Sequence, residues 1–293
     1  MPSPNAERGE IINCDSTAVY RGFDIGTDKV PMEERRGIPH HLIDIVDPME
    51  VYTAARFAED ASRLAREIQV RGKLPIVVGG TGFYYRALTR GLFPGPAADD
   101  ALRQRLEQIG ERRGNAFLHR MLARVDASSA TRIQANDRKR MIRALEVFFV
   151  TGQPLTSHFA GTVSPIAGMR VIAVALQIPS ELTAERVARR VDQQFARGLL
   201  DEIDALLKSG VPETARPFGG LVYRQVIEYL HGVRDLAATR ELIVRENRQY
   251  AKRQRTWLRK EPDLEWFDGP GESPATIAAV MAALAPRLQS NTI

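Results

Sequence analysis

The sequence predicts an α/β protein built on a parallel sheet. Three short apolar segments, at residues 10–15, 74–78 and 170–176, have the length and continuous apolar character of strands. Segments with helical periodicity lie between them, and strands that alternate with helices are typical of parallel sheets.

A helical insertion is expected to interrupt this core. Between residues 99 and 159 every periodic segment is helical, and the tripeptide at 94–96, Pro-Gly-Pro, marks a boundary before it. We therefore expect an α/β core with C-terminal helices, formed by residues 1–96 and 166–293, and a helical insertion at residues 97–165.

Individual helices follow from their apolar faces. Thr53 can accept a hydrogen bond at the start of a helix with apolar positions Phe57, Ala61, Leu64, Ala65 and Ile68. In the insertion, one helix has its apolar face at Met141, Ala144, Leu145 and Phe148, and a C-terminal helix has Ile277, Val280, Met281, Leu284 and Leu288.

Composition narrows the class of protein. The 293 residues are 44% hydrophobic and 26% charged, which is ordinary for a globular protein, and no apolar run approaches the ~20 residues of a membrane helix. The first residues lack a signal-peptide pattern, and the single cysteine, Cys14, excludes a disulfide within the chain. We expect a cytoplasmic monomer with no membrane contact.

Asp15 lies where the first strand should end. Ligands of open α/β sheets bind outside the carboxyl ends of the strands, so a carboxylate here can act as a general base. It can also cap the turn that follows, and position alone favours this cap over a general base.

A glycine-rich turn follows the strand at 74–78. In Gly79-Gly80-Thr81-Gly82 the backbone can approach a ligand closely, and N–H groups at the start of the next helix can hold an anion such as a diphosphate. A tight strand-to-helix turn is at least as good an explanation.

A basic stripe is predicted on a helix near residues 245–260. Arg245, Arg248, Lys252, Arg255 and Arg259 follow one another at spacings of three and four, so they share one helical face. A solvated face would mix in acids, whereas this segment has only Glu246, which favours contact with a polyanion. Tyr250 and Trp257 add possible stacking surfaces.

A second basic cluster lies in the insertion. A helix is expected to begin with the cations Arg138, Lys139, Arg140 and Arg143. Cations at the start of a helix interact unfavourably with the helix dipole, and a phosphate facing them would offset this cost. The pair His40-His41 has no further Cys or His at ligand spacing, so we interpret it as structural and leave the identity of any metal ligands open.

These motifs, in this order, resemble the tRNA dimethylallyltransferase family from about Arg8 to Phe267. No single motif is specific, but the ordered set is. The matching segments span residues 10–27, 39–44, 78–82, 91–96, 136–146, 249–254 and 256–259.

The resemblance implies a P-loop-type core of the nucleotide- and ATP-binding kind, with an insertion that grips the anticodon stem-loop of tRNA. It implies transfer of a dimethylallyl group from dimethylallyl diphosphate to N6 of the adenosine 3′ of the anticodon, with Mg²⁺. Asp15 would take the N6 proton, Thr81 and Arg103 would lie near the reacting groups, and Gly79, Gly80 and Thr81 would face the diphosphate. The implied tRNA contacts are Asp15, Ser16, Thr17, Ala18, Lys139, Arg140, Met141, Ile142, Arg143, Tyr223, Arg224, Arg248, Lys252, Arg253, Arg255, Trp257 and Arg259.

Two departures from the family pattern bear on these expectations. The family has a strand, a Gly-x-x-x-x-Gly-Lys-Ser/Thr loop and a helix before the first matched segment, and no such loop occurs in this sequence. We expect the chain without this first strand to be destabilised, aggregation-prone and unable to bind dimethylallyl diphosphate, and upstream DNA to encode the loop. At 218–224 the family usually has Arg where Gly219 stands and Gly where Val222 stands.

Two alternatives compete with a tRNA prenyltransferase. One is a catalytically dead remnant that still binds tRNA, which the missing loop favours and the retained Asp15 and Gly-Gly-Thr-Gly turn oppose. The other is an adenylate isopentenyltransferase acting on free nucleotides, against which the insertion and the basic stripe argue.

Overall fold

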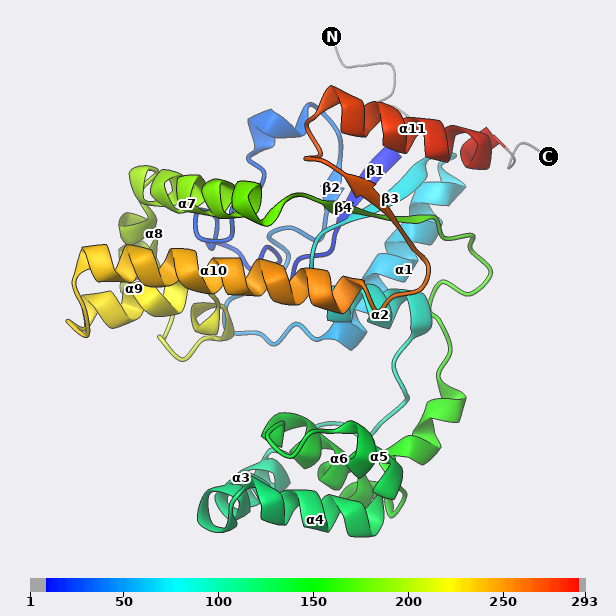
Figure 1. Ribbon diagram of the computed structural model, residues 1–293, viewed down its shortest axis with the longest axis vertical. Helices are drawn as coiled ribbons and strands as arrows, with labels where there is room; N and C mark the ends of the chain where they lie inside the picture. Colours follow the sequence, from blue (N-terminus) through cyan, green and yellow to red (C-terminus); the bar gives the residue numbers. More distant parts are fainter. Residues whose placement is uncertain (1–8, 290–293) are drawn as a thin grey trace. The chain divides into compact units, whose positions relative to one another are not determined.

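The computed structural model describes residues 9–289 and divides the chain into two compact units (Figure 1). Unit 1 comprises Met1–Thr89 and Gly168–Ile293, and unit 2 comprises Arg90–Ala167. The N-terminal residues that lack a signal-peptide pattern lie outside the described residues. No helix of the described chain is long and apolar enough to cross a membrane.

The first sheet of unit 1 has three parallel strands in the order β2-β1-β3. These are β1 (Gly9–Asn13), β2 (His40–His41) and β3 (Leu74–Val78), and β1 pairs with β3 along its whole length. Helix α1 (Ala54–Val70) connects β2 to β3 and packs on β1 and β3. It begins as predicted, because the Thr53 side chain accepts a hydrogen bond from the Arg56 N–H.

A second, two-stranded parallel sheet pairs β4 (Ala173–Gln177) with β5 (Leu264–Asp268). The strand expected at 170–176 therefore begins three residues late, because the five residues of β5 pair only with 173–177. Sequence reasoning missed β5, whose Leu-Glu-Trp-Phe-Asp composition is not a continuous apolar run.

Strand β3 is unusually exposed for an apolar strand. Within the described residues it pairs with β1 on one edge and with no strand on the other. Ile76 and Val77 are each 39% exposed and Val78 is 51% exposed. An apolar strand with a free edge is a template for pairing with another chain.

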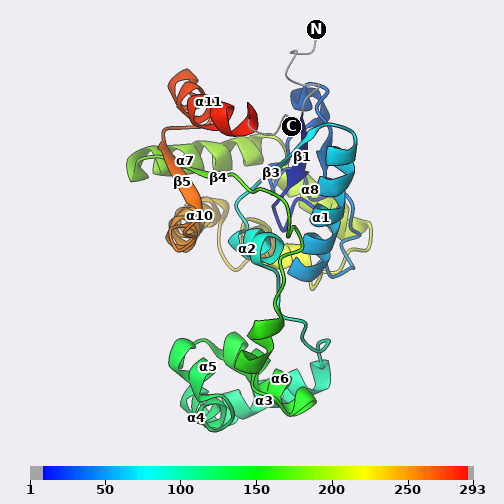
Figure 2. The same cartoon turned by 90° about the vertical axis from the view of Figure 1, so that its right-hand side faces the viewer.

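The helices of unit 1 gather around these strands. They are α2 (Gly82–Arg90), α7 (Ser180–Ala196), α8 (Leu199–Lys208), α9 (Tyr223–Leu230), α10 (Leu236–Leu258) and α11 (Pro274–Gln289), with 3-10 turns η1 (Met32–Arg35) and η3 (Arg216–Gly219). Helix α10 lies beside α7 and packs on α9 (Figures 1 and 2). Helix α11 contacts β5, yet much of its expected apolar face is exposed, including Ile277, Met281 and Leu288.

Within the described residues, unit 2 is helical throughout. It contains α3 (Asp100–Arg113), α4 (Asn115–Val125), α5 (Ala127–Arg132), α6 (Arg138–Thr151) and η2 (Leu155–Gly161). The predicted apolar face of α6 joins its core, because Met141, Ala144 and Leu145 are buried against Leu118 and Leu122.

Candidate functional site

Asp15 lies two residues beyond β1 and uses one carboxylate oxygen to shape its own loop. Its Oδ1 accepts hydrogen bonds from the Thr17 N–H at 2.7 Å, the Thr17 hydroxyl at 2.6 Å and the Ala18 N–H at 3.2 Å. Its Oδ2 has no hydrogen bond to any described residue. The cap expected from position is therefore present, and the second oxygen remains able to accept a proton.

The glycine-rich turn after β3 lies against this loop. A Cβ on Gly79 would stand 2.4 Å from the Cys14 carbonyl oxygen, so only glycine allows the approach. The Thr81 N–H donates to that carbonyl at 3.2 Å, and the Thr81 Oγ1 accepts from the Ser16 N–H at 3.1 Å. Since β1 and β3 are parallel neighbours, their carboxyl ends bring Asp15 and Thr81 together as the sequence predicts.

One N–H group of the turn is not free to bind an anion, because the Thr81 N–H donates to the Cys14 carbonyl. The turn is also held from outside, since the Gly80 carbonyl accepts from the Gln254 side chain at 3.0 Å. Burial raises the pKa of the Cys14 thiol to about 12, so this residue stays a neutral, buried group.

The loop beyond Asp15 is held by two sets of hydrogen bonds, one from the buried Lys29 and one to the half-buried Glu202. Lys29, which is 8% exposed, donates from Nζ to the Tyr20 carbonyl and to Asp24, each at 2.6 Å, and to Asp44 at 2.5 Å. Glu202 of α8 accepts from three consecutive backbone N–H groups, those of residues 24–26, at 2.6–3.2 Å. No local motif in the sequence indicates either set of bonds. The partners of Lys29 lie 5–15 residues away and those of Glu202 lie 176–178 residues away.

Tyr223 is buried inside the protein, whereas the family resemblance implies that it contacts tRNA. It is 1% exposed, donates to Glu202 at 2.7 Å, and its ring packs on Phe23 and Phe218. A Cβ on Gly26 would stand 2.4 Å from this ring, so the side chain fills the space beneath the loop and has no free surface for RNA. Ala18 is similarly buried, whereas Ser16 and Thr17 are half-buried.

Gly219 and Val222, the two positions near Tyr223 that differ from the family pattern, have different surroundings. Val222 is buried and has φ +76°, a conformation that β-branched residues rarely adopt. Gly219 has open space where a side chain would extend. Arg224 is exposed and ion-paired with Glu246 at 2.7 Å, which engages the one acid of the basic segment.

Helix α10 presents the predicted basic stripe to solvent. Arg245, Arg248, Lys252 and Arg255 make no ion pair with any described residue, and all but the half-buried Arg255 are exposed. Arg253 lies over the Tyr250 ring, with 5.8 Å from its guanidinium carbon to the ring centroid. Arg259, just past the helix, reaches Gln177 at 3.5 Å.

Trp257 faces away from the stripe. A Cβ on Gly82 would stand 2.2 Å from its ring, and the guanidinium carbon of Arg86 lies over the ring, 4.5 Å from its centroid. The indole therefore packs against the start of α2, and its expected stacking on a base is not supported by this placement.

The predicted residues of unit 2 divide into buried and exposed sets. Arg103 and Arg143 both donate to Glu146, which is fully buried, at 2.9 Å and 2.6 Å. Burial raises the pKa of Glu146, but these guanidinium groups outweigh it and hold the pKa below its usual range. Met141 and Ile142 are buried in the core, whereas Lys139 and Arg140 are exposed.

Residues 9–289 contain no group of three His, Cys, Asp or Glu side chains that could hold a metal ion. The histidine pair is structural as predicted: His41 bonds Glu10 at 2.7 Å and His40 bonds the Ile38 carbonyl at 2.8 Å.

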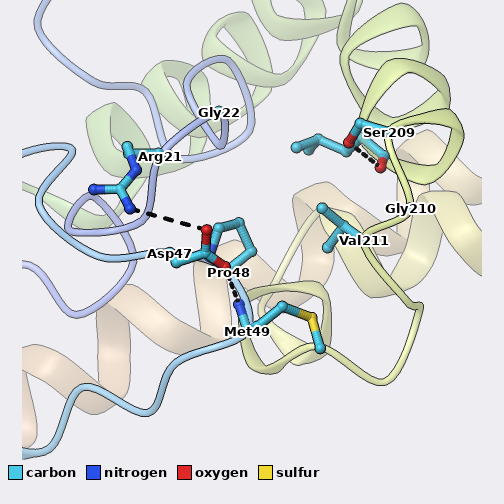
Figure 3. Close-up of a pocket in the computed structure, with 9 residues that line it drawn as sticks. Arg21, Gly22, Asp47, Pro48, Met49, Ser209, Gly210 and Val211 are labelled. Atoms are coloured by element: carbon cyan, nitrogen blue, oxygen red, sulfur yellow. Dashed lines mark hydrogen bonds and ion pairs between the residues drawn. The ribbon is translucent and has the colours of Figure 1, made fainter.

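A shallow pocket of about 420 Å³ lies at another place in unit 1 (Figure 3). Loops at 21–22 and 47–49 face the end of α8 across it, and Arg21 approaches Asp47 at 3.9 Å. None of the predicted site residues lines it.

Comparisons with known proteins agree on one family. A family model described as "IPP transferase" matches residues 18–261. A tRNA dimethylallyltransferase of Geobacter metallireducens is 45% identical over 94% of this chain and 90% of its own length. One of Solibacter usitatus is 46% identical over 91% of this chain and 86% of its own length.

Two solved structures extend the likeness to the fold. A full-length tRNA isopentenylpyrophosphate transferase from Bacillus halodurans is 35% identical, with a TM-score of 0.68 over 96% of this chain and 89% of that one. A eukaryotic dimethylallyltransferase acting on tRNA is 28% identical, with a TM-score of 0.79 over 97% of this chain and 73% of that one.

Proposed function

The chain belongs to the IPP transferase family, and we propose that it transfers a dimethylallyl group from dimethylallyl diphosphate to tRNA, at N6 of the adenosine 3′ of the anticodon. The observation that carries this proposal is the arrangement of Asp15, whose Oδ1 is fixed by three donors while Oδ2 has no hydrogen bond to any described residue, in a loop whose Ser16 N–H donates to Thr81.

The chemistry suits this arrangement. The lone pair of an exocyclic adenine amine is delocalised into the ring, so a base that accepts the N6 proton assists its attack. In the proposed step the bond from N6 to the allylic carbon forms, the bond from that carbon to the diphosphate oxygen breaks, and diphosphate leaves with the electron pair. Asp15 Oδ2 accepts the N6 proton.

The acceptor is a tRNA by the same proposal. The reacting base must leave its stack to reach a protein carboxylate, and the exposed stripe of α10 supplies cations for the phosphates on either side. A free mononucleotide would leave this stripe without a partner.

The proposal also includes a metal ion. We propose that Mg²⁺ binds the diphosphate, since the ion commonly binds through substrate phosphates and one or two carboxylates. We also propose that the protein acts in the cytoplasm as a monomer.

A competition assay tests the function. The chain, extended at its N-terminus by the strand and Gly-x-x-x-x-Gly-Lys-Ser/Thr loop of the family, is incubated with labelled dimethylallyl diphosphate, unmodified tRNA and AMP, and the label should enter tRNA. Label in AMP would instead support an adenylate isopentenyltransferase, and tRNA binding without transfer would support the remnant.

Asp15→Asn tests the base within the same assay. Asparagine keeps an oxygen that can accept from Thr17 and Ala18 but cannot take the proton, so single-turnover transfer should fall by roughly 10²–10⁴-fold while tRNA affinity holds. Asp263→Asn, which changes an exposed carboxylate, is the matched control. Transfer by Asp15→Asn near the parent rate would exclude Asp15 as the base.

A further inference from the structure

Helix α10 has two faces with different contacts. Its basic stripe, Arg245, Arg248, Lys252 and Arg255, is on the solvent side. Positions 250, 254 and 257 are spaced by four and three residues, so Tyr250, Gln254 and Trp257 share another face. This second face lies on the glycine-rich turn.

The contact between this face and the turn is close and specific. Gln254 Nε2 donates to the Gly80 carbonyl at 3.0 Å, and a Cβ on Gly80 would stand 2.4 Å from that nitrogen. At Gly82 a Cβ would meet the Trp257 ring at 2.2 Å. Glycine at both positions lets the helix seat directly on the backbone of the turn.

The turn is in direct contact with the Asp15 loop. Thr81, the residue after Gly80, donates to the Cys14 carbonyl at 3.2 Å and accepts from the Ser16 N–H at 3.1 Å. A displacement of Gly80 therefore changes the position of the residues on either side of Asp15.

We propose that Gln254 is a positioning residue, which transmits the docking of tRNA on the basic stripe of α10 to the Gly80–Thr81 backbone and so aligns Asp15 with the acceptor amine. This inference rests on the proposed function. A single neutral hydrogen bond contributes little to folding, but a misplacement of about 1 Å at a reacting centre can cost ~10²-fold in rate.

Gln254→Met tests the proposal, because methionine has a similar length and no N–H donor. We expect kcat for tRNA prenylation to fall roughly 10–100-fold, with tRNA affinity changed less than about 3-fold. Gln249→Met, an exposed change on the same helix, should leave both unchanged. Arg248→Ala should show the opposite split, with a raised KM and a retained kcat.

Hydrogen exchange supplies a readout that does not need turnover. In the parent chain, tRNA should protect the amides of residues 79–84, and in Gln254→Met it should bind without protecting them. Two results would overturn the coupling while leaving the proposed function intact. One is equal protection of residues 79–84 in both proteins, and the other is tRNA that binds the parent chain without protecting these residues. A parent chain that binds no tRNA would overturn the proposed function itself, and this inference with it.

Discussion

Glu10 is predicted to stabilise unit 1 through a buried carboxylate that ties all three strands of the first sheet. It lies on β1 and is 3% exposed. His41 of β2 and Arg71 reach its Oε2 at 2.7 Å each, and Lys73, just before β3, reaches its Oε1 at 3.2 Å. Burial raises the pKa of Glu10, but these hydrogen bonds outweigh it and lower the pKa from 4.5 to about 2.

The magnitude follows from linkage. A depression of that size corresponds to at most about 3 kcal/mol of stability at pH 7. Solvent screening reduces it, since the Arg71 and Lys73 side chains are 45% and 33% exposed. We therefore expect Glu10→Gln to lower the free energy of unfolding by roughly 1–3 kcal/mol at pH 7. Because the folded-state pKa is depressed, this contribution is complete above pH 4.5 and is lost as pH falls toward 2.

Urea unfolding followed by tryptophan fluorescence is a suitable assay, because both tryptophans, Trp257 and Trp266, lie in unit 1. Glu67→Gln is the control. Glu67 pairs with Arg63 at 3.0 Å on the surface, and its loss should cost under about 0.5 kcal/mol. A Glu10→Gln difference below that value at pH 7, or one that is unchanged between pH 7 and pH 3, would refute the reasoning.

Three further predictions concern RNA, strain and solubility. Replacing Arg248, Lys252 and Arg255 by Ala should reduce the slope of log tRNA affinity against log salt by about three units, and an unchanged slope would count against an RNA-facing stripe. Val222→Gly should change the free energy of unfolding by less than about 1.5 kcal/mol, because relief of the positive φ, about 1–3 kcal/mol, offsets lost burial of similar size; a urea midpoint that indicates a loss above about 3 kcal/mol would exclude the strain. Val77→Lys on the exposed strand should slow aggregation in light scattering without altering the circular dichroism spectrum, and equal aggregation would show that β3 is not the adhesive edge.

Local signals explain which parts of the fold could be predicted from the sequence. Strand β3 matches the expected 74–78 because apolar character ends abruptly at Gly79. Helix α1 begins where Thr53 caps it. Strand β5 carries Glu265 and Asp268 and exists because β4 pairs with it, a tertiary contact that no local pattern encodes.

The same distinction applies to the candidate site. The loops of Asp15 and Thr81 meet because parallel neighbouring strands end at one edge, and the family resemblance implies that both residues lie near the reacting groups. Glu202 and Gln254 support the site from 178 and 174 residues away from their respective partners, Asp24 and Gly80. Carboxylate and amide side chains on helices carry no local mark of such contacts.

Asp15 shows why alternatives drawn from position need not exclude each other. A cap and a base are two explanations of one carboxylate, and a carboxylate has two oxygens, which the structure uses differently. Three donors to Oδ1 fix the orientation of the group, and that same orientation leaves Oδ2 without a partner among the described residues. The local turn is therefore the means by which the chain orients its proposed base.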